Sequence, residues 1–180
     1  MHWETMQTGM QQTMSETKPI DPAGDRLSAL QERLKGSNIN EQTLLATDYL
    51  NHFNEIVMTL EMVADMPELL AEAKAWTPKT YQEHFLDSTF SDKDLAIEAY
   101  EIAPARYRKP FEAALASING LIALTIERAE AAVAAGETER LRHVTSEACR
   151  LIQRLMDVAS AIIHGSDKTL DQGEIDRLMG

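Results

Sequence analysis

Two long stretches of apolar residues at helical spacing constrain the fold of this chain more than any other feature. From about residue 110 to 135, and again from about 138 to 164, aliphatic side chains recur every three or four positions, as they do along one face of a helix. Gly136 separates the two stretches, and glycine commonly ends helices. So short a connection requires neighbouring helices to run antiparallel. The sequence therefore predicts a helical hairpin.

A third amphipathic stretch spans residues 41–64, with Asn40 as its expected N-cap. Pro104 and Pro110 are expected in the first turns of later helices. Aromatic residues make up only 6% of the chain and it has 8 glycines, a composition that favours helices over strands. We therefore predict an all-α protein, a four-helix-type bundle with short accessory helices. The accessory helices are expected near residues 22–35, 67–76, 81–85 and 92–100.

The chain divides into four parts by composition. Residues 1–21 are polar and aperiodic and are expected to form a disordered tail, in which Met14 is an alternative start to Met1. Residues 22–165 are expected to form the bundle domain. Residues 166–169 form a polar linker, and residues 170–180 form a short tethered helical peptide. The N-terminus has neither a basic nor an apolar region typical of a secretory signal.

The charge of the chain excludes several classes of partner. Its formal net charge is −12 with no basic cluster, so nucleic acid and anionic membrane surfaces would repel it. No apolar run approaches the roughly 20 residues of a membrane span, and we expect a cytoplasmic protein. Cys149, the only cysteine, lies in an apolar helical stripe and is expected to be buried. No glycine-rich phosphate loop appears, and no cofactor is expected.

The C-terminal peptide carries the signals of a small helix. Asp171 is a suitable N-cap, and Glu174 follows three residues later, as in a capping box. Leu170 and Ile175 occupy the positions of a hydrophobic staple. One face is apolar, formed by Ile175, Leu178 and Met179. A helix this short is marginal alone, so it is expected to fold when it docks in a groove.

The same peptide resembles the N-terminal peptide of the flagellar motor switch protein FliM, which reads roughly Leu-Ser-Gln-x-Glu-Ile-Asp-x-Leu-Leu. In that family the peptide binds the phosphorylated chemotaxis response regulator CheY. The matching positions here are Leu170, Gln172, Glu174, Ile175, Asp176 and Leu178, while Asp171 replaces the serine and Met179 a leucine. The resemblance implies that these residues and Met179 bind a response-regulator receiver protein.

A regulator-binding peptide tethered to a helical bundle is also similar in layout to the chemotaxis phosphatase CheZ. That enzyme orients the attacking water with an amide, and an acid lies four residues before the amide on the same helix. The pattern Asp-x-x-x-Gln does not occur in this chain. The CheC and CheX class of phosphatases uses Glu-x-x-Asn on a helix for the same purpose, and Asp48 with Asn51 resembles that pair.

Asp48 and Asn51 belong to a strip on the 41–64 helix that faces away from the predicted core. The strip also contains Leu44, Glu55, Met58 and Met62. Apolar side chains on such a strip indicate a contact surface. The strip is therefore either part of a phosphatase site or an interface within the bundle or between the two copies of a homodimer.

Two pairs on helical segments have the spacing of metal ligands, His52 with Glu55 and His84 with Asp87. A di-iron bundle requires the order Glu-x-x-His, which is absent, so no metal site is predicted.

Three functions follow as hypotheses. The first is a non-enzymatic adaptor or regulator that binds a two-component, chemotaxis-type response regulator through residues 170–179. The second is a response-regulator aspartyl-phosphate phosphatase that uses Asp48 and Asn51, with the peptide as a tether. The third is a structural or scaffolding bundle on which the peptide packs.

Overall fold

The computed structural model describes residues 21–166 and Arg177, and within them the protein is all-helical, as predicted. The only bridge between extended residues there is the isolated pair Ile39 and Ala46. The helices are α1 (Pro22–Leu34), α2 (Asn51–Val63), α3 (Leu70–Ala75), α4 (Tyr81–Asp87), α5 (Lys93–Glu101), α6 (Ala105–Ala134) and α7 (Thr138–Ile163). Two 3₁₀ turns, η1 (Thr47–Leu50) and η2 (Pro67–Leu69), precede α2 and α3.

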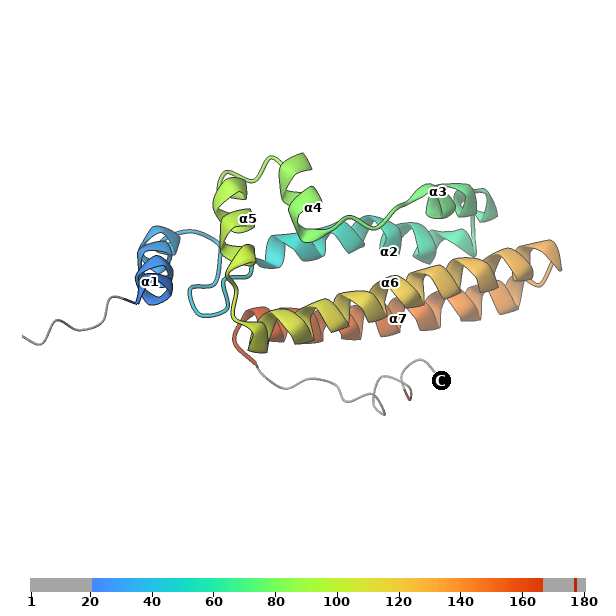
Figure 1. Ribbon diagram of the computed structural model, residues 1–180. Helices are drawn as coiled ribbons and strands as arrows, with labels where there is room; N and C mark the ends of the chain where they lie inside the picture. The colour runs from blue at the N-terminus through green and yellow to red at the C-terminus, as the bar shows by residue number, and fades with distance from the viewer. Residues whose placement is uncertain (1–20, 167–176, 178–180) are drawn as a thin grey trace, which may run out of the picture.

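The helices α6 and α7 form the predicted antiparallel hairpin and pack along their length (Figure 1). Gly136 makes the turn with a φ of +68°, which an L side chain rarely adopts. Its N–H donates to the carbonyl of Val133 at 3.1 Å, and the N–H of Glu137 donates to that of Ala132 at 3.0 Å. These two bonds form a Schellman motif, which satisfies the last carbonyls of α6.

The third helix, α2, packs on α7, but it begins ten residues later than predicted. Asn40 caps a turn rather than a helix, because its side-chain oxygen accepts the N–H groups of Gln42 and Thr43, each at 2.9 Å. Leu44 then adopts a φ of +60°, which stops a right-handed helix. The prediction of a helix over 41–64 is therefore wrong for residues 41–46, which form a loop whose residues 43–46 are buried.

Two further boundaries differ from the prediction. Asp21 is the N-cap of α1, since its carboxylate accepts the N–H of Ala23 at 3.2 Å, so the described structure starts one residue before the predicted boundary. Pro104 precedes α6, and Pro110 lies inside it, not in its first turn. Because proline lacks an N–H, α6 loses one hydrogen bond in its second turn.

The shorter helices cover the remaining sides of the core. α3 packs on α6, α4 packs against α5 and η1, and α1 lies at the end of the molecule remote from α3 (Figure 1). The largest fully buried side chains include the aromatics Tyr49, Phe53, Phe85 and Phe111. Val133, in the last turn of α6 beside the hairpin turn, is 38% exposed.

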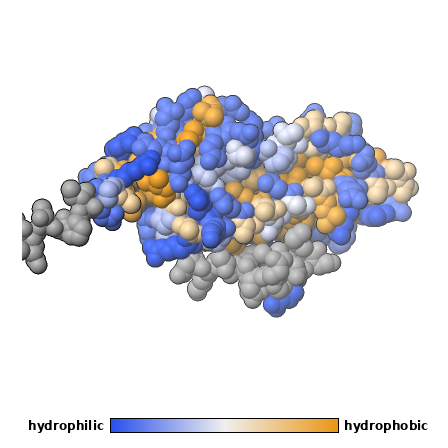
Figure 2. Space-filling view, in the orientation of Figure 1, coloured by the Kyte–Doolittle hydropathy of each residue, from blue (hydrophilic) through white to orange (hydrophobic). Residues whose placement is uncertain are grey.

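The surface that Figure 2 shows is mostly hydrophilic, with hydrophobic patches over the half of the molecule that holds α3 and the α6–α7 turn. Among the described residues, no helix combines the length and the apolar character needed to cross a membrane.

Candidate functional site

The predicted partner-binding peptide lies outside the described residues, apart from Arg177. This applies to Leu170, Gln172, Glu174, Ile175, Asp176, Leu178 and Met179. The structure does describe the point from which the peptide leaves the body. Gly165, with a φ of +100°, donates its N–H to the carbonyl of Ile162, and the N–H of Ser166 donates to that of Ala161. This second Schellman motif ends α7, so the peptide is attached to a capped helix end.

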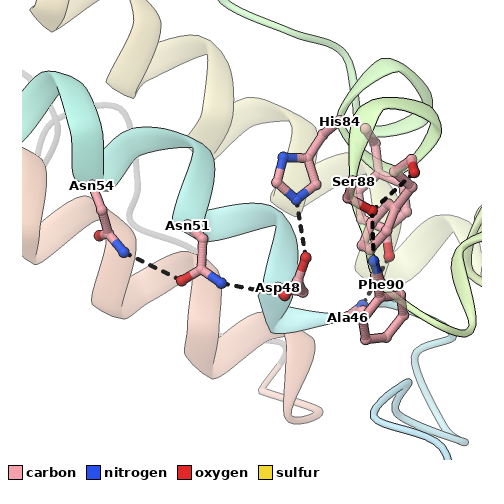
Figure 3. A network of polar contacts seen from close by, with 9 residues as sticks. Ala46, Asp48, Asn51, Asn54, His84, Ser88 and Phe90 are labelled. Carbon is pink, nitrogen blue, oxygen red and sulfur yellow. Dashed lines mark hydrogen bonds and ion pairs between the residues drawn. The ribbon is translucent and has the colours of Figure 1, made fainter.

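Asp48 and Asn51 lie together, as their spacing predicted. Asp48 is in η1 and Asn51 is the first residue of α2. The side-chain amide of Asn51 donates to one carboxylate oxygen of Asp48 at 3.3 Å, and the side-chain amide of Asn54 donates to the Oδ1 atom of Asn51 at 3.2 Å. Figure 3 shows the three side chains in line along the exposed side of the helix.

His84 completes this polar cluster from a different helix. Its Nε2 lies 3.0 Å from the second carboxylate oxygen of Asp48 (Figure 3). The His84 side chain is 14% exposed and that of Asp48 is 32% exposed. Ser88 fixes the end of α4, because its hydroxyl donates to the Phe85 carbonyl and accepts the N–H of Phe90. The Asp48 carboxylate is thus held on two sides while water still reaches it.

His52 lies beside this cluster and has a structural role. Its Nε2 accepts the backbone N–H of Lys79 at 2.9 Å, and its ring stacks on Trp76 at a centroid distance of 4.9 Å. Burial, with smaller contributions from the charges of His84 and Lys79, lowers the pKa of His52 to about 4. The ring is therefore a neutral hydrogen-bond acceptor at physiological pH.

The residues of the pair His84 and Asp87, considered as metal ligands, form other contacts. His84 contacts Asp48, and the carboxylate of Asp87 pairs with the Lys79 ammonium at 3.0 Å. Across residues 21–166, no three histidine, cysteine or acidic side chains gather in the way that a metal ion requires.

The predicted contact strip is present on α2 without Leu44. Met58 is 61% exposed and Met62 is 42% exposed, and both lie on the side of the helix that carries Asn51. Leu44 is fully buried, because the loop at residues 41–46 turns it into the core. The strip therefore has a polar end at Asp48 and Asn51 and an apolar end at the two methionines.

The polar end can orient a water molecule. Asn51 is exposed, and only one hydrogen of its amide group is used by Asp48. The second amide hydrogen and the free lone pairs of the Asp48 carboxylate face solvent. The exposed amide and carboxylate can therefore both hydrogen-bond a water molecule that lies beside them.

Sequence reasoning missed two features of this region. It did not place His84 next to Asp48, and local spacing cannot predict a contact between residues 36 positions apart. It also missed a groove between α2 and α7, lined in part by Arg142, Arg150 and Arg154. Arg150 and Arg154 lie four residues apart, the spacing at which side chains share one face of a helix.

The comparisons with known proteins found no match for this chain, whether to a protein-family model, a curated protein or a solved structure.

Proposed function

We propose that this protein is a cytosolic adaptor or regulator, built as a four-helix-type bundle, that binds the receiver domain of a two-component, chemotaxis-type response regulator through residues 170–179. The observation that carries the proposal is the sequence of that peptide. It combines the FliM-like pattern with its own helix-start signals and an apolar face of Ile175, Leu178 and Met179.

The described body supports a tethered role for the peptide. α7 ends in a closed cap at Gly165, so the peptide follows a defined helix end after a short polar linker. Three apolar side chains contribute about 1.5–3 kcal/mol each when they dock, and ordering about ten residues opposes them. We expect a dissociation constant on the order of micromolar.

Calorimetric titration of the full chain with phosphorylated and unphosphorylated receiver tests the proposal. We expect tighter binding of the phosphorylated form. Ile175→Ala should weaken binding at least tenfold, because Ile175 serves both the staple and the docking face. Thr169→Ala, in the linker, is the matched control and should bind like the unaltered chain. Equal binding by Ile175→Ala and the unaltered chain would contradict the proposal.

A second function, phosphatase activity on the receiver, is supported by the geometry of Asp48 and Asn51. Dephosphorylation should slow at least tenfold in Asn51→Ala while receiver binding stays the same. Glu61→Gln is the control, since it changes an exposed polar side chain almost three turns further along the same helix. If the receiver loses its phosphoryl group equally fast with and without the protein, the adaptor function alone remains.

A further inference from the structure

Three methionines form an exposed apolar ridge along the outer side of α2. Met58 is 61% exposed, Met62 is 42% exposed and Met66 is 40% exposed. They follow each other at intervals of four residues, a spacing that places side chains on one side of a helix. Met66 lies just beyond α2, but its N–H donates to the carbonyl of Met62 at 2.9 Å, so the helical spacing continues to it.

This methionine ridge is the longest line of exposed apolar side chains in the part of the chain that the structure describes. The two other large apolar side chains exposed there are Leu86 on α4 and Val133 on α6, which lie on different helices. Single exposed apolar residues are common on protein surfaces, whereas a contiguous group of them indicates an interface. Methionine is frequent at such interfaces because its side chain is flexible and polarisable.

The charges at the two ends of the ridge indicate what covers it. Glu55, one turn before Met58, is exposed and forms no ion pair within residues 21–166. At the other end, Arg142 of α7 bonds the carboxylate of Asp65 at 2.8 Å, and about half of the arginine side chain remains exposed. The ridge therefore has an unpaired acid at one end and an exposed arginine at the other. Such a surface is complementary to a copy of itself turned end for end.

We infer that the methionine ridge is the interface of a homodimer, in which α2 of one copy packs antiparallel on α2 of a second copy. In the register that we infer, Met58 packs against Met62 of the second copy. Glu55, three residues before Met58, is then level with residue 65, three residues after Met62. Arg142 of the second copy lies there, beside its own Asp65.

The two-fold symmetry of such a dimer repeats each contact. Each dimer therefore contains two contacts between Met58 and Met62, and Glu55 approaches Arg142 twice. A parallel pairing of the same helices would instead bring the two Glu55 carboxylates together, which is unfavourable. The charges thus favour the antiparallel arrangement.

The size of the ridge determines how strong the dimer is. From residue 55 to residue 65 the contact runs about 15 Å along α2, at about 1.5 Å per residue. So short a contact buries much less than the roughly 2,000 Å² or more of an obligate dimer. The net charge of −12 on each copy adds repulsion between them. We therefore expect a reversible dimer with a dissociation constant on the order of ~10–100 micromolar.

Association through α2 does not involve residues 170–179, so the inference is independent of the proposed function. If both are correct, one dimer carries two receiver-binding peptides. A partner that presents two receivers side by side would then be bound more tightly than a single receiver, without any new contact.

Sedimentation equilibrium of the full chain over concentrations from about 1 to about 500 micromolar tests the inference. The mean mass should rise from that of a monomer toward that of a dimer, with no receiver present. Met62→Lys should raise the dissociation constant at least tenfold, because it places a charge in the apolar centre of the contact in both copies. Leu86→Lys is the matched control on α4, where the side chain is 60% exposed, and should associate like the unaltered chain.

A mixing experiment tests the antiparallel register. Glu55→Arg and Arg142→Glu should each weaken self-association about threefold to tenfold, because each dimer of either variant has two like-charge contacts. In an equimolar mixture, one chain supplies arginine at both positions and the other glutamate at both. The mixed dimer therefore regains both opposite-charge contacts and should form about as tightly as the unaltered dimer. A mixture of Glu55→Arg with Arg128→Glu, an exposed arginine on α6, should not regain this affinity.

Three results would overturn the inference. A chain that stays monomeric at the highest concentration would show that the ridge does not bind a second copy. Association that Met62→Lys leaves unchanged would place the interface elsewhere on the molecule. Association that Met62→Lys abolishes, but that the charge-exchanged mixture does not restore, would exclude the antiparallel register. Circular dichroism checks that Met62→Lys is folded; if it is not, Met58→Lys, at the more exposed position, supplies the same test.

Discussion

The contact between His52 and the Lys79 backbone predicts how the stability of this protein depends on pH. The neutral ring accepts the Lys79 N–H, and burial lowers the pKa of His52 to about 4 from its usual 6.5. Below pH 6.5 the unfolded chain takes up a proton at this site, and the folded chain does not until the pH approaches 4. Stability from this group is therefore complete above pH 6.5 and is lost as the pH falls toward 4.

The size of the effect follows from the two pKa values. Each pKa unit corresponds to about 1.4 kcal/mol, so a fall from 6.5 to about 4 sets an upper limit of about 3 kcal/mol. Because the ring is only half-buried, solvent screens it and we expect about 1–2 kcal/mol. Most of this loss should appear between pH 7 and pH 5, above the range in which ordinary carboxylates titrate.

Urea unfolding followed by circular dichroism at pH 7, 6 and 5 measures this loss. His52→Gln is the comparison, because its side-chain oxygen can accept the Lys79 N–H but does not titrate. The variant should be less stable at pH 7, through loss of stacking on Trp76, and its unfolding free energy should fall less steeply with pH. Parallel pH profiles for the two proteins would refute the assignment of the pH dependence to His52.

Three further predictions concern local structure. Gly120→Ala should stabilise the protein by roughly 0.5–1 kcal/mol, since it lies mid-helix in α6 and, apart from the adjacent backbone of that helix, no atom of the described residues lies within 4 Å of the added methyl group. Gly136→Ala should destabilise it by about 1 kcal/mol, since the residue has a φ of +68°; urea unfolding measures both. The Cys149 thiol should react with iodoacetamide at least tenfold more slowly in the native than in the unfolded protein, because it is buried and burial raises its pKa to about 12.

Periodicity predicted the α6–α7 hairpin because each helix buries one face against its partner. Ile118 of α6 and Ile152 of α7, which belong to these apolar stretches, are fully buried. The prediction of a helix starting at residue 41 failed because a helix N-cap and an isolated turn have the same sequence signal. Asn40 accepts backbone N–H groups two and three residues ahead, which is what an N-cap does and also what an isolated turn does. The isolated turn differs from a helix N-cap here in the positive φ of Leu44, and a leucine in the sequence does not predict a positive φ.

At the candidate site, only the contacts between residues close together in the sequence could be predicted. The spacing of Asp48 and Asn51 places them one turn apart on any helix, and they do form a hydrogen bond. His84 and the α2–α7 groove arise from tertiary packing, which periodicity does not specify. Met58 and Met62 were placed on the exposed side correctly because both lie within the part of the helix that forms.

The hydroxyl of Thr43 donates to the carbonyl of Ile163 at 2.6 Å, across a separation of 120 residues. Closing so long a loop is entropically costly, so this contact between the loop at residues 41–46 and the end of α7 should be among the last contacts to form. During synthesis the Thr43 hydroxyl cannot reach this partner until almost the whole described body has been translated. The end of α7 closes through local bonds, and its anchorage to the N-terminal half of the body comes later.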